Sequence, residues 1–131
     1  MKYVLSQKSL DKLQGVDERL VRVVKRAIAI TNMDFTVGEG VRSLERQKVL
    51  VIQGKSQTMK SKHLVGLAVD LWVLKDGVIT WDKQVYIDFA PIMKQAAKEE
   101  GVEIRWGGDF KSFFDGQLQN FVDVFTFVSN I

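Results

Sequence analysis

The only histidine of the chain, His63, precedes an aspartate, Asp70, by seven positions. An imidazole and a carboxylate are both zinc ligands, and the chain has no cysteine that would offer a thiolate instead. Two ligands of one zinc ion lie only about 3 to 3.5 Å apart. Seven positions span roughly 10 Å along a helix and more than about 20 Å along a strand. A shared ion therefore requires the chain to fold back between the two residues.

A glycine, Gly66, lies between this histidine and this aspartate. Its backbone freedom allows a sharp turn, after which a strand starting at Leu67 would carry Asp70. We therefore expect His63 in a loop, Asp70 on the following strand, and the two side chains within a few ångströms of each other. The alternative is a surface histidine that happens to lie beside a strand aspartate, because a lone histidine is usually not a ligand.

The segment around this pair carries the pattern Ser-x-His-x-x-Gly-x-Ala-x-Asp at residues 61–70. The pattern resembles the zinc-binding signature of the VanY-type D-Ala-D-Ala carboxypeptidases and the phage L-Ala-D-Glu endolysins. Residues 40–47, with Gly-Val-Arg-Ser and Glu-Arg-Gln, and residues 106–110, Trp-Gly-Gly-Asp-Phe, are similar to further segments of that family. The resemblance covers most of the chain up to Asp115 and implies the hedgehog/DD-peptidase fold.

The resemblance also implies roles for individual residues. His63 and Asp70 match the positions that bind zinc. Arg42 matches an arginine that binds substrate and stabilises the oxyanion, although a lone arginine is also commonly a surface salt-bridge residue. Ser61 would hydrogen-bond the substrate, unless it makes only a local turn. Trp106, at the start of the last matching segment, is assigned to substrate binding.

One zinc ligand of the family is missing. Its members end in Asp-x-x-His, where the acid is the general base and the histidine is the third ligand. Asp115 keeps the position of the base, but Leu118 stands where the histidine belongs, as if three residues were lost between Gly116 and Gln117. Asp123 is a conceivable replacement ligand, but an outward-facing polar residue on a strand explains it equally well.

The resemblance thus implies a zinc-dependent, endolysin-like peptidoglycan peptidase that cuts L-Ala-D-Glu or D-Ala-D-Ala bonds of cell-wall stem peptides. Catalytic zinc sites generally use three protein ligands, so we expect zinc occupancy and activity to be impaired. The competing hypothesis is a catalytically inactive relic of this fold that only binds peptide or a partner. The sequence does not decide between endopeptidase and carboxypeptidase action.

Helices are predicted from capping residues and apolar spacing. Ser9 would cap a turn at 10–13, Ser43 would open a helix that runs through Ile52, and Gly54 would end it. Asp82 would cap a helix that reaches Glu100 and ends at Gly101, unless the helix starts near Pro91 or kinks there. Asp17 would cap a longer helix with Leu20, Val23, Val24, Ala27 and Ile28 inside, and the inner face of the helix after Asp82 would hold Ile87, Ala90, Met93 and Ala97.

Strands are predicted from β-branched and aromatic runs at residues 35–41, 67–74, 78–81, 102–106 and 121–128. Asp76 and Gly77 form a hairpin signal that should pair the second run with the third in antiparallel fashion. Residues 54–62 and 107–116 should be loops. The order of elements predicts a small single α+β domain over residues 1–131, with a mostly antiparallel sheet packed with helices.

The composition fits one globular domain, with 131 residues, of which 46% are hydrophobic and 27% are charged. The absence of cysteine excludes disulfides and cysteine nucleophiles. The start of the chain lacks the apolar run of a signal peptide, and no apolar run is long enough for a membrane span, so we expect synthesis in the cytoplasm and action on the cell wall after release. The net charge of +3 is spread over both signs, which does not favour a nucleic-acid partner.

Overall fold

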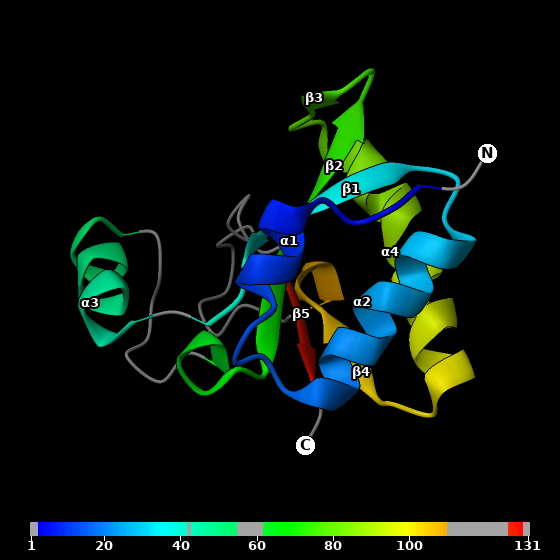
Figure 1. Ribbon diagram of the computed structural model, residues 1–131. Coiled ribbons are helices and arrows are strands. Elements are labelled where there is room, and N and C mark those ends of the chain that lie inside the picture. Colours follow the sequence, from blue (N-terminus) through cyan, green and yellow to red (C-terminus); the bar gives the residue numbers. More distant parts are fainter. Residues whose placement is uncertain (1–2, 42, 55–61, 110–125, 130–131) are drawn as a thin grey trace.

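A computed structural model describes residues 3–41, 43–54, 62–109 and 126–129 (Figure 1). Its centre is an antiparallel sheet in the order β1-β2-β5-β4, and β3 pairs with β2 outside this path. The strands are β1 (Asp34–Glu39), β2 (Ala68–Lys75), β3 (Val78–Ile79), β4 (Ile104–Trp106) and β5 (Thr126–Ser129). The predicted α+β class with an antiparallel sheet is confirmed.

The described ranges contain four α-helices: α1 (Gln7–Lys12), α2 (Glu18–Ile30), α3 (Leu44–Ile52) and α4 (Lys83–Glu100). Helices α2 and α4 pack against each other and against the sheet, whereas α3 projects to one side of the molecule (Figure 1). Two short 3-10 turns, η1 (Lys62–Val65) and η2 (Gly107–Asp109), precede β2 and follow β4. None of the helices in the described ranges is both long and apolar enough to cross a membrane.

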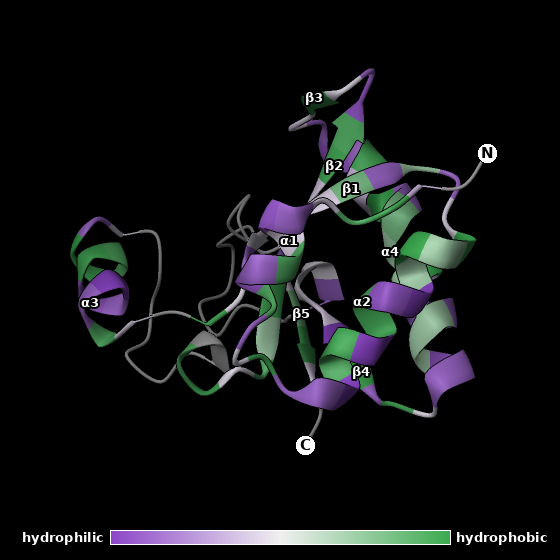
Figure 2. Cartoon of the chain, viewed as in Figure 1, coloured by the Kyte–Doolittle hydropathy of each residue, from purple (hydrophilic) through white to green (hydrophobic). Residues whose placement is uncertain are grey.

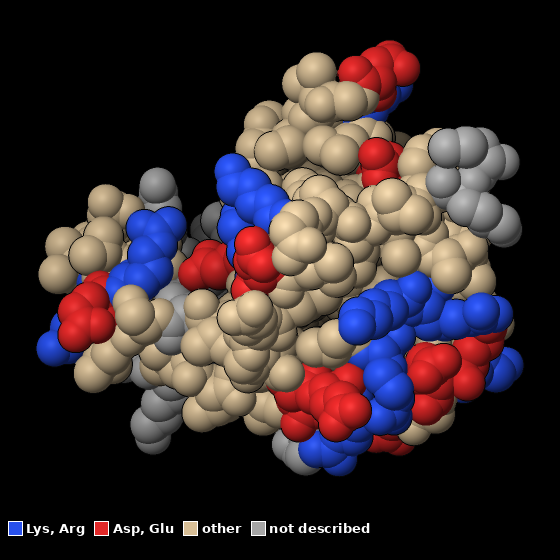
Figure 3. Space-filling view, viewed as in Figure 1, with Lys and Arg blue, Asp and Glu red and all other residues tan. Residues whose placement is uncertain are grey.

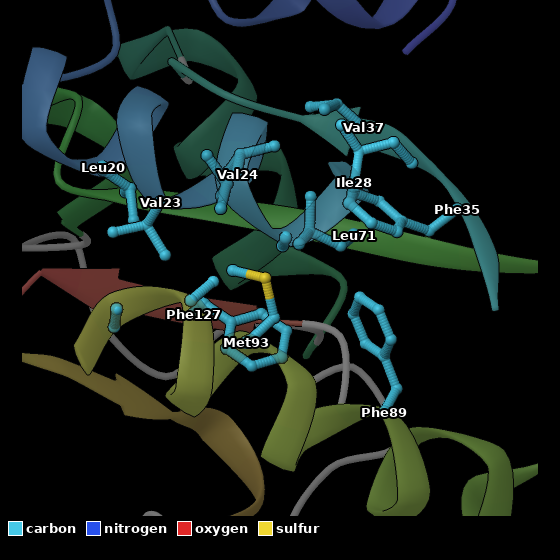
Figure 4. Close-up of a cluster of buried hydrophobic side chains, with 14 of the residues drawn as sticks. Leu20, Val23, Val24, Ile28, Phe35, Val37, Leu71, Phe89, Met93 and Phe127 are labelled. Atoms are coloured by element: carbon cyan, nitrogen blue, oxygen red, sulfur yellow. The ribbon is translucent and has the colours of Figure 1, made fainter. Parts of the chain in front are cut away.

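The hydrophobic core lies between one face of the sheet and the pair α2 and α4 (Figure 4). Alternate residues of β2 point into it, and the ring of Phe89 on α4 packs against Phe35 and Phe127, with centroids 5.1 and 6.0 Å away. Hydrophobic and hydrophilic residues alternate along both helices, as amphipathic spacing requires (Figure 2). The residues that α2 buries are Leu20, Val23, Val24, Ala27 and Ile28, as predicted.

The inner face of α4 differs from the prediction at one position. Ile87 is 40% exposed, although it was expected inside. The buried face of the helix instead contains Tyr86 and Phe89. Ile87 lies about 100° around the helix axis from Tyr86, and its side chain is therefore turned away from this face. The buried residues of α4 are Tyr86, Phe89, Ala90, Met93, Ala96 and Ala97.

Ion pairs join the outer surfaces of these two helices. Arg26 Nε donates to Glu99 Oε1 over 2.6 Å, and Arg22 Nε lies 3.5 Å from a carboxylate oxygen of Glu100. Basic and acidic side chains are intermixed on this part of the surface (Figure 3). All four side chains are partly exposed, so solvent screens each pair and its contribution to stability is small.

Helix capping was predicted correctly for three helices. Asp17, Ser43 and Asp82 each accept a hydrogen bond from a backbone amide of the first turn, over 2.9 to 3.0 Å. Gly101 ends α4 in the left-handed conformation, at a φ of 68°. The helix runs without interruption from Lys83 through Pro91, so the alternative in which it begins near Pro91 is wrong.

The predicted cap of the first helix was wrong. Ser6, not Ser9, caps α1 by accepting a hydrogen bond from the Ser9 amide over 3.1 Å. Ser9 lies within the helix and is fully buried. Its buried hydroxyl is satisfied by a hydrogen bond that it accepts from the amide of Val37 and by a hydrogen bond of 2.8 Å with the Thr36 hydroxyl. These contacts fix α1 beside β1, which local sequence patterns cannot reveal.

The strands match the predicted runs with shifted ends. The hairpin between β2 and β3 is confirmed, with left-handed φ values of 53° at Asp76 and 79° at Gly77. β1 starts one residue earlier than expected and ends at Glu39 after an irregular register. β4 starts only at Ile104, because the Val102 amide closes the end of α4. The predicted strand 121–128 is confirmed for 126–128, and its first five residues lie outside the described part.

Candidate functional site

Asp70 is the third residue of β2 and lies on the sheet face opposite the core. Its neighbours Val69 and Leu71 point into the core, so alternation turns Asp70 away from it. The residue is nevertheless only 4% exposed. Its Oδ1 accepts a hydrogen bond from the hydroxyl of Thr126 on β5 over 2.7 Å. The carboxylate is therefore held inside the molecule, where a charge requires partners.

The strands on both sides of β2 bring polar residues beside Asp70. The register pairs Asp70 with Glu39 at the end of β1 and with Thr126 at the start of β5. Paired residues of antiparallel strands present their side chains on the same face, with Cβ atoms about 4.5 to 5.5 Å apart. Sequence reasoning missed both Glu39 and Thr126, because strand register was not predictable from the sequence alone.

The chain folds back between His63 and Asp70, as expected. The backbone of His63 belongs to the short 3-10 turn η1 rather than to an irregular loop, and η1 packs against β2. Gly66 follows with a φ of 75°, and a Cβ atom added there would lie 2.5 Å from the carbonyl oxygen of Gly15. Only glycine fits this turn without strain. His63 and Asp70 thus lie on different elements joined by a tight reversal.

The side chain of His63 lies outside the described part of the structure, so its approach to Asp70 stays a prediction. The same holds for the other residues assigned from the sequence. Arg42, Ser61, Asp115 and Asp123 all lie outside the described ranges, and so does Leu118 at the position of the missing ligand. Their roles stay predictions.

Trp106, assigned to substrate binding, ends β4 and is 8% exposed. It pairs with Phe127, so its side chain faces the core, on the sheet face opposite Asp70. Gly108 leaves no space for a side chain above the ring, and Lys94 Nζ lies 5.8 Å from the ring centroid. This position gives Trp106 a structural role as the anchor of η2. Substrate contact by this residue remains a prediction.

The donor types at this site fit zinc. Asp70 offers a carboxylate oxygen and His63 would offer an imidazole nitrogen, both of which are common zinc ligands. Within residues 3–41, 43–54, 62–109 and 126–129, no group of three or more histidine, cysteine, aspartate or glutamate residues is arranged to hold a metal ion. Of the residues predicted to bind zinc, Asp70 is the one whose side chain lies in the described part of the structure.

Comparisons with known proteins show which family the chain resembles. The family model for phage L-alanyl-D-glutamate peptidases matches residues 1–128. The chain is 29% identical over 119 residues to the L-alanyl-D-glutamate peptidase of Escherichia phage T5, covering 88% of this chain and 87% of that protein. It is 30% identical over 118 residues to the enzyme of the same name from Listeria phage A118, covering 86% of this chain but 39% of that protein. The crystal structure of the Serratia marcescens L-Ala D-Glu endopeptidase ChiX matches with a TM-score of 0.83 and 35% identity, covering 96% of this chain and 90% of that one.

Proposed function

The chain belongs to the phage L-alanyl-D-glutamate peptidase family, and on this premise we propose that it hydrolyses the L-Ala-D-Glu bond of peptidoglycan stem peptides, acting on the cell wall after release. The relatives are named for this bond, which favours it over the D-Ala-D-Ala bond. The observation that carries the proposal is the buried carboxylate of Asp70, on the strand that follows the tight turn from His63. The bond lies inside the stem peptide, so the action is that of an endopeptidase.

His63 and Asp70 would hold the zinc ion, which supplies a Lewis acid that polarises the scissile carbonyl and activates water. Asp115 would accept the proton of the attacking water and later donate it to the leaving amine of D-Glu. Arg42 would pair with the oxygen of the carbonyl as negative charge develops on it. Ser61 would hydrogen-bond the substrate peptide beside the histidine.

The proposed zinc site lacks one ligand. His63 is the only histidine of the chain, so no second imidazole can coordinate the metal. Leucine at position 118 has no donor atom. Two protein ligands bind zinc more weakly than the usual three, so both zinc occupancy and the rate of hydrolysis should be low. Asp123 remains the candidate for a replacement ligand.

Product analysis tests which bond is cut. We would incubate the chain with purified peptidoglycan and an excess of zinc, and then identify the new amino termini by mass spectrometry. We expect new termini at D-Glu, with L-Ala left on the muramic acid. Asp70→Asn keeps the size and polarity of the side chain but removes its charge, and it should abolish these products. New carboxyl termini at the fourth residue of the stem peptide, without termini at D-Glu, would contradict the proposal.

A second candidate function is binding without catalysis, which the missing third ligand favours. In that case the chain would cosediment with peptidoglycan but release no product at any zinc concentration. Asp70→Asn would then leave the binding unchanged, because the carboxylate would hold no metal ion and take part in no hydrolysis. Cosedimentation and product analysis on the same samples separate the two functions.

A further inference from the structure

The strand β5 inserts between β2 and β4 and brings Thr126 directly opposite Asp70. The Thr126 hydroxyl donates to Oδ1 of the carboxylate over 2.7 Å. Hydrogen bonds to an ionised acceptor are about twice as strong as neutral ones. The carboxylate of a buried aspartate is therefore held by a donor from a neighbouring strand.

The position of this donor is itself fixed by the sheet. The pairs Val69 with Phe127 and Ala68 with Val128 continue the same ladder, and the Phe127 ring is fully buried in the core. A shift of the register by one residue would expose this ring and turn a different side chain toward Asp70. The β-branched side chain of threonine is also restricted about its first torsion, which limits the directions that its hydroxyl can take.

We infer that Thr126 is a positioning residue of the candidate zinc site, which orients the carboxylate of Asp70 for metal coordination. The inference rests on the proposed function, because it assumes that Asp70 binds zinc. A carboxylate ligand must direct one oxygen toward the metal, and a hydrogen bond to its other oxygen removes the competing rotations. Groups that hold ligands in this way typically change metal affinity by about 10 to 100-fold when they are removed.

The test uses two variants of Thr126 and a matched control. Thr126→Val keeps the branched shape and removes the hydroxyl, whereas Thr126→Ser keeps the hydroxyl. Thr36→Val removes a hydroxyl from β1 that bonds Ser9 and does not touch Asp70. Zinc dissociation constants would be measured by competition with a chelator on the full metal-free chain.

We expect Thr126→Val to weaken zinc binding by about 10 to 100-fold, and Thr126→Ser and Thr36→Val to stay within about threefold of the unmodified chain. Equal affinities for Thr126→Val and the unmodified chain would overturn the inference. An equally large loss in Thr36→Val would also overturn it, because the effect would then come from general weakening of the sheet. If Thr126→Val does not fold, as judged by circular dichroism, Thr126→Ala takes its place in the comparison.

A second measurement does not need zinc. Three-bond scalar couplings report the side-chain rotamer of Asp70 in the metal-free protein. One rotamer should dominate in the unmodified chain and in Thr126→Ser, and several should interconvert in Thr126→Val. If the unmodified chain binds no zinc, the proposed zinc site fails, whereas the inference about positioning is then decided by these rotamers alone. Unchanged couplings in Thr126→Val would reject it.

Discussion

The backbone amide of Asp17 donates a hydrogen bond of 2.8 Å to the carbonyl of Gly66. Asp17 is also the N-cap of α2, so this bond ties the turn between His63 and Asp70 to the start of a core helix. The same turn has no space for a side chain at Gly66, because the carbonyl oxygen of Gly15 lies against it. The geometry of the candidate site therefore depends on a contact far from its ligands in sequence.

Replacing Gly66 by alanine should lower the unfolding free energy by more than the left-handed backbone conformation at this position alone would cause. Gly54 is a matched control, because it has nearly the same φ, 74° against 75°, but nothing within 4 Å of an added Cβ. Gly54→Ala should cost about 1 kcal/mol of unfolding free energy, the ordinary penalty of a left-handed alanine. Gly66→Ala should cost at least about 2 kcal/mol, because the backbone must also shift.

Urea denaturation followed by circular dichroism measures both losses. Equal losses of unfolding free energy in the two variants would show that the nearby carbonyl oxygen of Gly15 adds no cost to the substitution of Gly66. A loss of zinc binding in Gly66→Ala, with normal binding in Gly54→Ala, would further link this turn to the metal site.

The strand register yields a prediction about the missing ligand. Thr126 faces Asp70, so a histidine at this position would project toward the same metal ion. Thr126→His should still raise zinc affinity, because the added metal ligand should gain more than the about 10 to 100-fold that loss of the Thr126 hydroxyl costs. Leu118→His, at the position indicated by the sequence pattern, is the comparison. A larger gain in Leu118→His than in Thr126→His, measured by chelator competition, would refute the prediction.

Tyr86 connects α4 to the end of the hairpin. Its hydroxyl accepts a hydrogen bond from the Val73 amide over 3.0 Å and donates one to the Thr80 carbonyl over 2.8 Å, inside the core. Tyr86→Phe would leave both backbone groups without this partner, which should cost about 1 to 3 kcal/mol of unfolding free energy. Thermal and urea unfolding both measure this loss. A change below about 0.5 kcal/mol would show that water replaces the hydroxyl.

Burial raises the pKa of the Tyr86 hydroxyl above its ordinary value of 10.0. The folded state therefore holds this proton more tightly than the unfolded state does. The resulting stability is complete below pH 10 and is lost as the pH rises above it, because only the unfolded chain then ionises readily. Unfolding free energies measured from pH 8 to 11 should fall less steeply in Tyr86→Phe than in the unmodified chain. Parallel curves for the two proteins would contradict this assignment.

Local patterns predicted much of this fold. The buried side of α2, the hairpin at Asp76 and the caps Ser43 and Asp82 depend on residues close in sequence, and all are confirmed. The failures depend on contacts between distant segments. Ser9 was misread as a cap because its partners lie on β1, 27 and 28 positions later.

In the candidate site, too, features that depend on neighbouring residues were predictable, and features that depend on distant segments were not. The turn from His63 to Asp70 was predictable, because Gly66 marks it locally. Thr126 was not, because a donor 56 positions from Asp70 becomes its neighbour only through the register of β5. A polar residue in an apolar strand gives a weak signal, since alternation alone accounts for it.

The most direct test is a zinc titration of peptidoglycan cleavage by the unmodified chain, with cleavage counted as new D-Glu amino termini. The account predicts no cleavage after removal of zinc with a chelator, slow cleavage that rises only at high zinc concentration, and none at any concentration in His63→Ala or Asp70→Asn. Full cleavage in the presence of chelator would contradict the zinc site. Equal cleavage by Asp70→Asn would contradict the role of its carboxylate, and no cleavage at any zinc concentration would contradict the proposed peptidase activity.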